Sequence, residues 1–284
     1  MTSSFELGGA RTRPSHSLQM RVGCDHAEIW AVDQHVAKIH APGTDPELLA
    51  RRLAVASDPQ LAEILVAPLA PHPHVAPNGR LVTLWPRVEV VEPQDVAGYP
   101  WAPLGDLLAR LHDVPIPPGL PRVDPGVRAR RVLARLPDTA PKALLTAVLA
   151  ISAATGHDLD APATLVHGDV HLGQLGRRGT TWLLLDLDDL AVGDPVGDLA
   201  RLGAFWAAGL LPTTAWQSLL TAYHRRRPGG IPADDTELWR RLDRPARIAL
   251  VTAAARAVIS GQDPEATDLL LGACARIVRE DAPR

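Results

Sequence analysis

The feature that most constrains the fold is a polar stretch, LVHGDVHLGQL, at residues 165–175 between apolar flanks. It contains two histidines, an aspartate, two glycines and a glutamine. A buried strand would not carry so many polar groups, because each would need a hydrogen-bond partner in the interior. A loop that only had to dissolve in water would not need them so close together. The stretch therefore indicates a loop that gathers polar side chains at a site.

The residues that follow predict a hairpin that returns to this loop. QLGRR and TWLLLD are strand-like runs joined by a turn at Gly179-Thr180, and the second run ends at Asp186. Magnesium prefers oxygen ligands and takes one or two from carboxylates, while phosphates and water complete its shell. Asp186 and the amide oxygen of Gln174 are suitable ligands, and Asp169 is left to orient or deprotonate a hydroxyl. This is the layout of phosphoryl transfer in kinases.

The rest of the chain predicts a β-rich first third followed by helices. A helix is expected to open at Asp45-Pro46-Glu47, where proline suits an early helical position. Strand-like runs occupy residues 18–23, 27–32, 35–40, 61–71 and 80–91. Helical spacing of apolar residues occupies 101–114, 126–137, 142–155, 195–209, 214–226, 237–261 and 264–280. The pattern predicts an α+β fold with two lobes.

Charge and composition exclude several classes of protein. The chain has 29 basic and 32 acidic residues, which argues against a nucleic-acid partner. The polar N-terminus lacks the apolar core of a signal peptide, and the longest apolar run, residues 248–259, is too short to span a membrane. Cys24 and Cys274 lie too far apart in sequence to suggest a disulfide framework or a zinc motif. We expect a cytoplasmic protein, monomeric or homodimeric, with neither a membrane nor a nucleic-acid partner.

Lysine is rare in this chain. Of the 29 basic residues only Lys38 and Lys142 are lysines, and the remainder are arginines. A lysine retained against that bias is a candidate for a role that needs a compact point charge. Lys38 also lies among the apolar residues Val36, Ala37 and Ile39. The alternative is an ordinary exposed lysine on a strand.

The motif HGDVHLGQ followed by LLDLDDLAVGDPVGDLA resembles the aminoglycoside phosphotransferase branch of the protein-kinase-like fold. That family has a His-Gly-Asp loop, a metal-binding amide five residues after the aspartate, a strand ending in a metal-binding aspartate, and Gly-Asp-Pro eight residues beyond. The resemblance implies that Asp169 is the catalytic aspartate and that Gln174 and Asp186 bind magnesium. Asp194 and Asp198 would support the site structurally.

The resemblance extends upstream and implies a nucleotide site. HVAKIH is similar to the strand whose lysine, here Lys38, holds the α- and β-phosphates of ATP. The adenine-binding hinge would fall in LVTLWPRVE, around Trp85, Arg87 and Val88. The implied lobes are residues 1–88, a small β-rich nucleotide-binding lobe, and residues 89–284, a larger helical lobe with the catalytic loop and acceptor site.

Three positions depart from the family pattern. Gln174 stands where most members have asparagine. No acidic residue lies in the middle of the helix after Lys38, so either Glu47, at its start, pairs with the lysine or the lysine is oriented otherwise. A glycine-rich phosphate loop is missing, and only Gly23 lies near its place.

The two histidines of the loop have their own alternatives. His167 and His171 are spaced as two zinc ligands on a helix would be, but the intervening glycine and aspartate argue against a helix. We expect His167 to hydrogen-bond the loop backbone so that Asp169 points outward. Taken singly, Asp169 and Asp186 could be turn-capping carboxylates; their joint spacing favours catalysis.

These features predict an ATP- and Mg²⁺-dependent kinase that phosphorylates a hydroxyl of a small molecule. The later helices carry acidic residues that would attract an amino sugar, but arginines lie among them. We therefore expect no strongly negative surface that would attract a polycation. A sugar or amino sugar is therefore the expected acceptor. The alternatives are an antibiotic resistance kinase and a nucleotide-binding pseudokinase that acts as a regulatory module.

Overall fold

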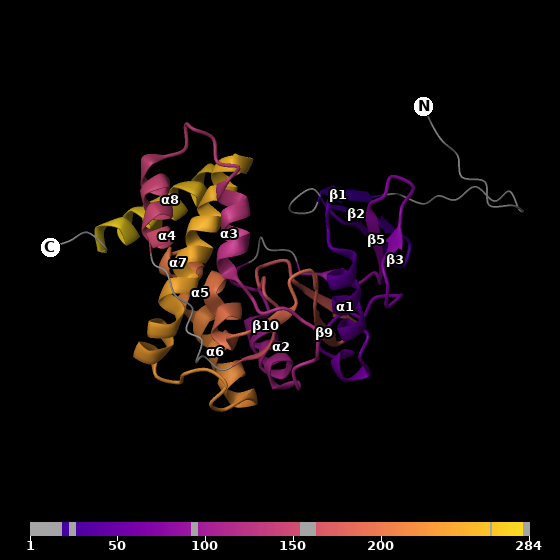
Figure 1. Cartoon of the computed structure of the whole chain (residues 1–284). Helices are drawn as coiled ribbons and strands as arrows, with labels where there is room; N and C mark the ends of the chain where they lie inside the picture. Colours follow the sequence, from indigo (N-terminus) through magenta and orange to yellow (C-terminus); the bar gives the residue numbers. More distant parts are fainter. Residues whose placement is uncertain (1–18, 23–26, 92–95, 154–162, 262, 281–284) are drawn as a thin grey trace, which may run out of the picture.

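The computed structural model describes residues 19–22, 27–91, 96–153, 163–261 and 263–280. A sheet of N-terminal strands with helix α1 lies at one end of the molecule, and α3–α8 lie at the other (Figure 1). Helix α2 and strands β9 and β10 lie between these ends. The fold is α+β, with a small β-rich N-terminal part and a larger helical C-terminal part, as the sequence predicts.

The N-terminal sheet is antiparallel, with strand order β1-β2-β3-β5-β4. Its strands are β1 (Gln19–Val22), β2 (Glu28–Val32), β3 (His35–Ile39), β4 (His74–Val75) and β5 (Leu81–Pro86). The first three lie within predicted runs, which confirms those predictions. In the register of the sheet Lys38 lies opposite Ile29 on β2 and Thr83 on β5. The lysine therefore belongs to the central strand of the sheet.

Helix α1 (Pro46–Ala56) begins where the sequence predicts. The side chain of Asp45 accepts hydrogen bonds from the backbone N–H groups of Glu47 and Leu48, at 2.9 and 3.1 Å, and so caps the helix. Leu49 and Leu53 are buried on its inner face and form a small apolar cluster with Leu81 of β5. The N-terminal cap and this apolar face fix the helix against the sheet.

The strand predicted at residues 61–71 is wrong. The chain forms a short 3₁₀ helix, η2 (Pro59–Leu61), followed by turns, and only Leu65 makes an isolated parallel bridge, with Leu184. Leu61, Ile64 and Leu65 have the spacing of one helical turn and are all buried in the main core. Pro68 and Pro71 have no N–H to give to a ladder, so the run cannot continue as a strand.

The C-terminal part begins with β6 (Glu89–Val90), which pairs with β8, while β8 pairs with β9 and β7 with β10. Its remaining strands are β7 (Thr164–Val166), β8 (Leu175–Arg178), β9 (Thr181–Leu184) and β10 (Ala191–Gly193). Its helices are α2 (Trp101–Asp113), α3 (Pro125–Leu133), α4 (Lys142–Ala153), η3 (Pro195–Leu199), α5 (Ala200–Ala207), α6 (Thr213–Arg226), α7 (Asp235–Ser260) and α8 (Pro264–Glu280). The predicted hairpin of β8 and β9 is confirmed.

The main core surrounds α2, which packs closely on α6. A Cβ atom at Gly105 would lie 2.2 Å from the carbonyl oxygen of Leu219, so the two backbones meet at this glycine. Buried leucines of α2, β7–β9, η3 and α6 form one apolar cluster, and α3, α4, α7 and α8 contribute to a second. Within the part of the chain that the structure describes, no helix is long and apolar enough to cross a membrane.

Candidate active site

The loop between β7 and β8 is anchored by the buried carboxylate of Asp198 in η3. One oxygen accepts from the backbone N–H of His167 at 2.7 Å and the other from Gly168 at 2.8 Å. The ring Nε2 of His112 lies 3.0 Å from the same carboxylate, and its Nδ1 lies 2.8 Å from the hydroxyl of Tyr223. Burial alone would raise the pKa of Asp198, but the hydrogen bond from His112 leads the interactions that lower it below its ordinary value. Asp198 is therefore an ionised anchor.

His167 ties this loop to the strand that carries Asp186. Its ring Nε2 lies 2.7 Å from the carbonyl oxygen of Leu185, which accepts the hydrogen bond. Gly168 adopts a left-handed conformation (φ +83°), and a Cβ there would lie 2.3 Å from the carbonyl oxygen of Asp189. Only glycine fits both the conformation and the close approach. The two residues just before Asp169 are thus held against the segment that follows β9.

Asp169 extends from this loop beside Arg201. An oxygen of its carboxylate lies 3.2 Å from Nη1 of Arg201, and the other lies 3.8 Å from Nε2 of His171. The guanidinium of Arg201 also lies over the ring of Phe205. Sequence reasoning missed Arg201, although it lies three residues after Asp198 at the start of a helix and so shares a face with it. The ion pair with Arg201 orients the carboxylate of Asp169.

Gln174 is buried, and His171 fixes the direction of its amide. The amide Nε2 lies 2.9 Å from Nε2 of His171, whose Nδ1 lies 2.5 Å from the carbonyl oxygen of Leu172. Nδ1–H therefore donates to Leu172, and Nε2 accepts from the amide of Gln174. Burial is the largest cause that lowers the pKa of His171 to about 4, and Arg201 lowers it further, so the ring is neutral near pH 7. The amide oxygen of Gln174 is left to face a cation.

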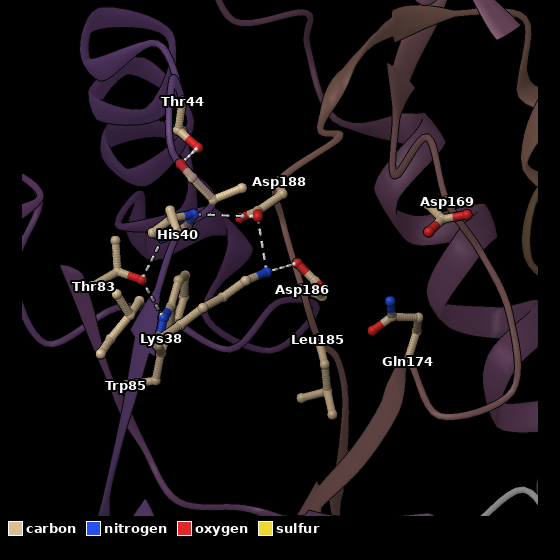
Figure 2. A network of polar contacts seen from close by, with 12 residues as sticks. Lys38, His40, Thr44, Thr83, Trp85, Asp169, Gln174, Leu185, Asp186 and Asp188 are labelled. Atoms are coloured by element: carbon tan, nitrogen blue, oxygen red, sulfur yellow. Dashed lines mark hydrogen bonds and ion pairs between the residues drawn. The ribbon is translucent and has the colours of Figure 1, made fainter. Parts of the chain in front are cut away.

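Lys38 crosses from the N-terminal sheet to two aspartates of the C-terminal part. Its Nζ lies 2.5 Å from an oxygen of Asp186 and 2.8 Å from one of Asp188 (Figure 2). Burial alone would lower the pKa of Lys38, but the two carboxylates raise it above its ordinary value. Asp186 has a left-handed backbone (φ +57°), which aspartate tolerates better than most residues. A charged ammonium thus lies against the predicted metal-binding carboxylate.

The structure does not bring Glu47 to Lys38. Glu47 lies in the first turn of α1 with 84% of its side chain exposed, and its carboxylate lies 3.3 Å from Arg51. An acid in the first turn is favoured by the helix dipole alone, which explains its presence without a nucleotide. The middle of α1 instead contributes Arg52, whose Nε donates to the carbonyl oxygen of Leu190 at 3.0 Å. Of the two alternatives left open by the sequence, the structure has the second: Lys38 pairs with Asp186 and Asp188, and Glu47 does not contact it.

The other predicted residues occupy varied places. Trp85 lies on β5 and its indole N–H donates to Thr83 at 2.9 Å. Arg87 is exposed and points to the turn between β2 and β3, where its Nη1 donates to the carbonyl oxygen of Asp33 at 3.3 Å. Val88 is half-buried against Gly176. Gly23 and Cys24 lie outside the described residues.

Asp194 is the N-cap of η3, where it accepts from the backbone N–H of Val196 at 2.9 Å. Its carboxylate also pairs with Arg241 of α7. These contacts hold η3, and with it Asp198, against the helical part of the molecule.

The donors around Asp186 fit a magnesium ion. Its carboxylate is 38% exposed, and the only cation that the described residues place on it is the Lys38 ammonium. In the view of Figure 2, Gln174 lies between Asp186 and Asp169. Among the described residues no group of three or more His, Cys, Asp or Glu side chains is arranged to hold a metal. A carboxylate and an amide oxygen suit an ion that completes its shell with phosphates and water.

Comparisons with known proteins place the chain in a family. Residues 21–230 match the model of the phosphotransferase enzyme family, APH. No protein of curated function matches the sequence significantly.

Among solved structures, a thermostable mutant of aminoglycoside phosphotransferase APH(4)-Ia is similar with a TM-score of 0.66, at 14% identity over 95% of this chain and 97% of that one. Choline kinase from Cryptosporidium parvum gives 0.63, at 9% identity over 93% and 88%. Spectinomycin phosphotransferase APH(9)-Ia, in complex with ADP and spectinomycin, gives 0.59, at 16% identity over 94% and 90%. At such identities these likenesses show a shared fold. With its family match over most of its length and its protein-kinase-like fold, the chain belongs to the APH phosphotransferase enzyme family.

Proposed function

We propose that this protein transfers the γ-phosphate of ATP to a hydroxyl of a small molecule. The observation that carries the proposal is that Lys38, Asp169, Gln174 and Asp186 come together from separate elements, with Gln174 between Asp186 and Asp169 in the view of Figure 2. The nucleotide is proposed because one solved structure of this fold is a complex with ADP and another with AMP-PNP. A charged lysine beside a carboxylate and an amide oxygen is what a metal–triphosphate complex requires.

In this proposal each side chain acts mainly by position and charge. Asp169, held by Arg201, accepts the proton of the acceptor hydroxyl as the bond to phosphorus forms. Lys38 binds the phosphates that are not transferred. Asp186 and Gln174 would hold Mg²⁺, which offsets the charge on the phosphate oxygens when it is bound. Most of the rate then arises from orientation and electrostatics.

The acceptor we propose is a small hydroxylated molecule, a sugar or amino sugar. Three acids at or within α7 already have partners, because Asp234 caps the helix, Glu237 pairs with Arg240 and Asp243 pairs with Arg247. A multiply charged cation would need several carboxylates without such partners. This arrangement supports a less charged acceptor over a polycationic antibiotic.

The test is acceptor-dependent ADP release by the purified protein with ATP and magnesium. The panel contains sugars, amino sugars, aminoglycosides and amino alcohols. We expect turnover on one class, and a fall in kcat of about 10²–10⁴-fold in Asp169→Asn, because the general base is lost. Asp113→Asn, an exposed carboxylate at the end of α2, is the matched control and should retain full activity. Turnover that survives in Asp169→Asn would refute the catalytic assignment. A flat panel with intact nucleotide binding would favour a pseudokinase.

A further inference from the structure

A chain of polar contacts in the N-terminal part of the molecule ends on the ammonium of Lys38 (Figure 2). The indole Nε1 of Trp85 lies 2.9 Å from Oγ1 of Thr83, which lies 2.9 Å from Nε2 of His40. Nδ1 of His40 lies 3.3 Å from an oxygen of Asp188, and that oxygen lies 2.8 Å from Nζ of Lys38. Lys38 lies on β3 and His40 just after it, Thr83 and Trp85 lie on β5, and Asp188 lies in the segment after β9. We refer to Trp85, Thr83, His40 and Asp188 as the relay.

The chemistry of the donors gives the relay one direction. An ionised carboxylate can only accept, so Nδ1 of His40 carries a hydrogen and donates it to Asp188. When the ring carries that one hydrogen, its Nε2 accepts from the hydroxyl of Thr83, which accepts from the indole N–H of Trp85. Thr83 and His40 are each 1% exposed, so water cannot easily replace these bonds. The relay therefore orients the carboxylate of Asp188, through its contact with His40, for the contact with Lys38.

We propose that Asp188, oriented by this relay, is the positioning residue that holds Lys38 toward the nucleotide, in place of an acid on α1. The inference rests on the proposed function, because it gives the lysine its role in phosphate binding. Asp186 and Asp188 both contact Lys38, but they differ in what else holds them. Asp186 is the carboxylate that would hold Mg²⁺, and a bound cation would compete with the ammonium for it. Asp188 has His40 as a second partner and remains on the lysine.

The position of α1 supports these different roles for Asp186 and Asp188. An acid on the middle of α1 is not available, because that part of the helix carries Arg52, which donates to the carbonyl oxygen of Leu190. The helix thus contacts the segment after Asp188 through an arginine and a backbone oxygen. The negative charge that lies against Lys38 comes instead from Asp188, just before that segment.

The decisive measurement is the Kd of AMP-PNP by calorimetry, with and without magnesium, on the full chain. We expect Asp188→Asn to weaken binding about 10-fold in both conditions, since it acts through the lysine. Asp186→Asn should instead abolish the gain in affinity that magnesium gives. If Asp188→Asn behaves like Asp186→Asn, the residue is a metal ligand and the proposal is overturned. Unchanged Kd values in Asp188→Asn would overturn it equally.

A double-mutant cycle separates positioning from a general structural role. In a Lys38→Met background, Asp188→Asn should change the Kd no further, because its effect passes through the lysine. An equal loss in both backgrounds would overturn the proposal. Thermal melts on each variant verify that the loss of binding is not a loss of folding.

The relay itself is tested at His40. In His40→Asn the amide nitrogen takes the place of Nδ1 and can still donate to Asp188, so we expect partial recovery relative to His40→Leu. His35→Leu, at an exposed position of the same strand, is the control and should bind nucleotide normally. A ¹⁵N NMR spectrum of the wild type should show His40 protonated on Nδ1. Equal binding in His40→Leu and the wild type, or protonation on Nε2, would refute the relay.

Failure of this inference is distinguishable from failure of the proposed function. If the wild type binds nucleotide but Asp188→Asn binds it equally well, only the role of Asp188 is lost. If the wild type does not bind AMP-PNP at all, the proposed function and this inference fall together. Nucleotide binding without turnover on any acceptor leaves the test of Asp188 intact.

Discussion

The two ends of the molecule hold their functional side chains by different means. The loop of Asp169 is supported by a large apolar cluster around α2 and α6 and by the buried Asp198. Between the N-terminal sheet and α1 the described residues form a small apolar cluster of Leu49, Leu53 and Leu81, with Trp85 packed on it. There Lys38 is held by ion pairs and the relay. The loop of Asp169 is thus fixed by the core, whereas Lys38 is fixed by polar contacts that cross between the two parts.

The largest effect that would test this contrast is expected at Asp198. Asp198→Asn leaves His112 and two backbone N–H groups without their anion, so we expect a loss of about 3–5 kcal/mol in the free energy of unfolding. The measurement is urea unfolding at pH 7. A loss below about 1 kcal/mol would show that the core alone positions the loop.

The contribution of Asp198 to the free energy of unfolding is expected to depend on pH. Because the pKa of Asp198 is lower in the folded protein than its unfolded value of about 3.9, its stabilisation is complete above that value and disappears as the pH falls through the folded pKa. The difference between wild type and Asp198→Asn should therefore shrink as urea unfolding is repeated from pH 6 down to pH 3. A difference that stays constant would contradict this assignment.

Two leucines compare the two apolar clusters directly. Leu108 of α2 and Leu53 of α1 are both almost fully buried. We expect Leu108→Ala to lower the free energy of unfolding by about 4 kcal/mol and Leu53→Ala by about 2, because the smaller cluster relaxes more easily around the lost atoms. Leu149→Ala, at an exposed position of α4, is the control and should change it by less than about 0.5 kcal/mol. Equal losses at Leu108 and Leu53 would remove the contrast.

The smallest effect is expected at the contact between α1 and the segment after Asp188. Arg52→Ala removes the hydrogen bond to Leu190 and should cost about 1 kcal/mol of unfolding free energy. Arg51→Ala, its neighbour on the same helix, loses an exposed pair with Glu47 and a long, exposed hydrogen bond to the carbonyl oxygen of Gly119, and should cost less than about 0.5 kcal/mol. Chemical denaturation of both variants gives the comparison. If Arg51→Ala costs as much as Arg52→Ala, the contact does not join the two parts.

Local sequence patterns predicted helices and strands well where a single hydrophobic period or a single N-terminal cap determined the element. The run around Lys38 and the start of α1 at Asp45 were predicted correctly, as was the hairpin that ends near Asp186. The apolar run at 61–71 was predicted as a strand because short apolar runs do not reveal their period. Its prolines were the signal that could have corrected this.

The partners of the candidate site were harder to predict than its members. Glu47 was proposed for Lys38 because only neighbours in sequence could be considered. Thr83 meets His40 only through the register of β3 and β5, and Asp188 meets Lys38 only when the two parts of the chain come together. Such pairings depend on tertiary structure, which residue spacing does not contain. Arg201 was different, because its helical phase with Asp198 was available in the sequence.

The bridge between Leu65 and Leu184 has a consequence for synthesis on the ribosome. The backbone around Leu65 bonds to Leu184 on both sides, Leu184 N to Ile64 O at 2.8 Å and Val66 N to Leu184 O at 3.0 Å. The first of these segments leaves the ribosome long before the second has been translated. Leu61, Ile64 and Leu65 therefore remain a short apolar segment, exposed to solvent and accessible to chaperones, until β9 has been translated and can cover them. The nascent chain cannot complete its N-terminal part first and its C-terminal part afterwards.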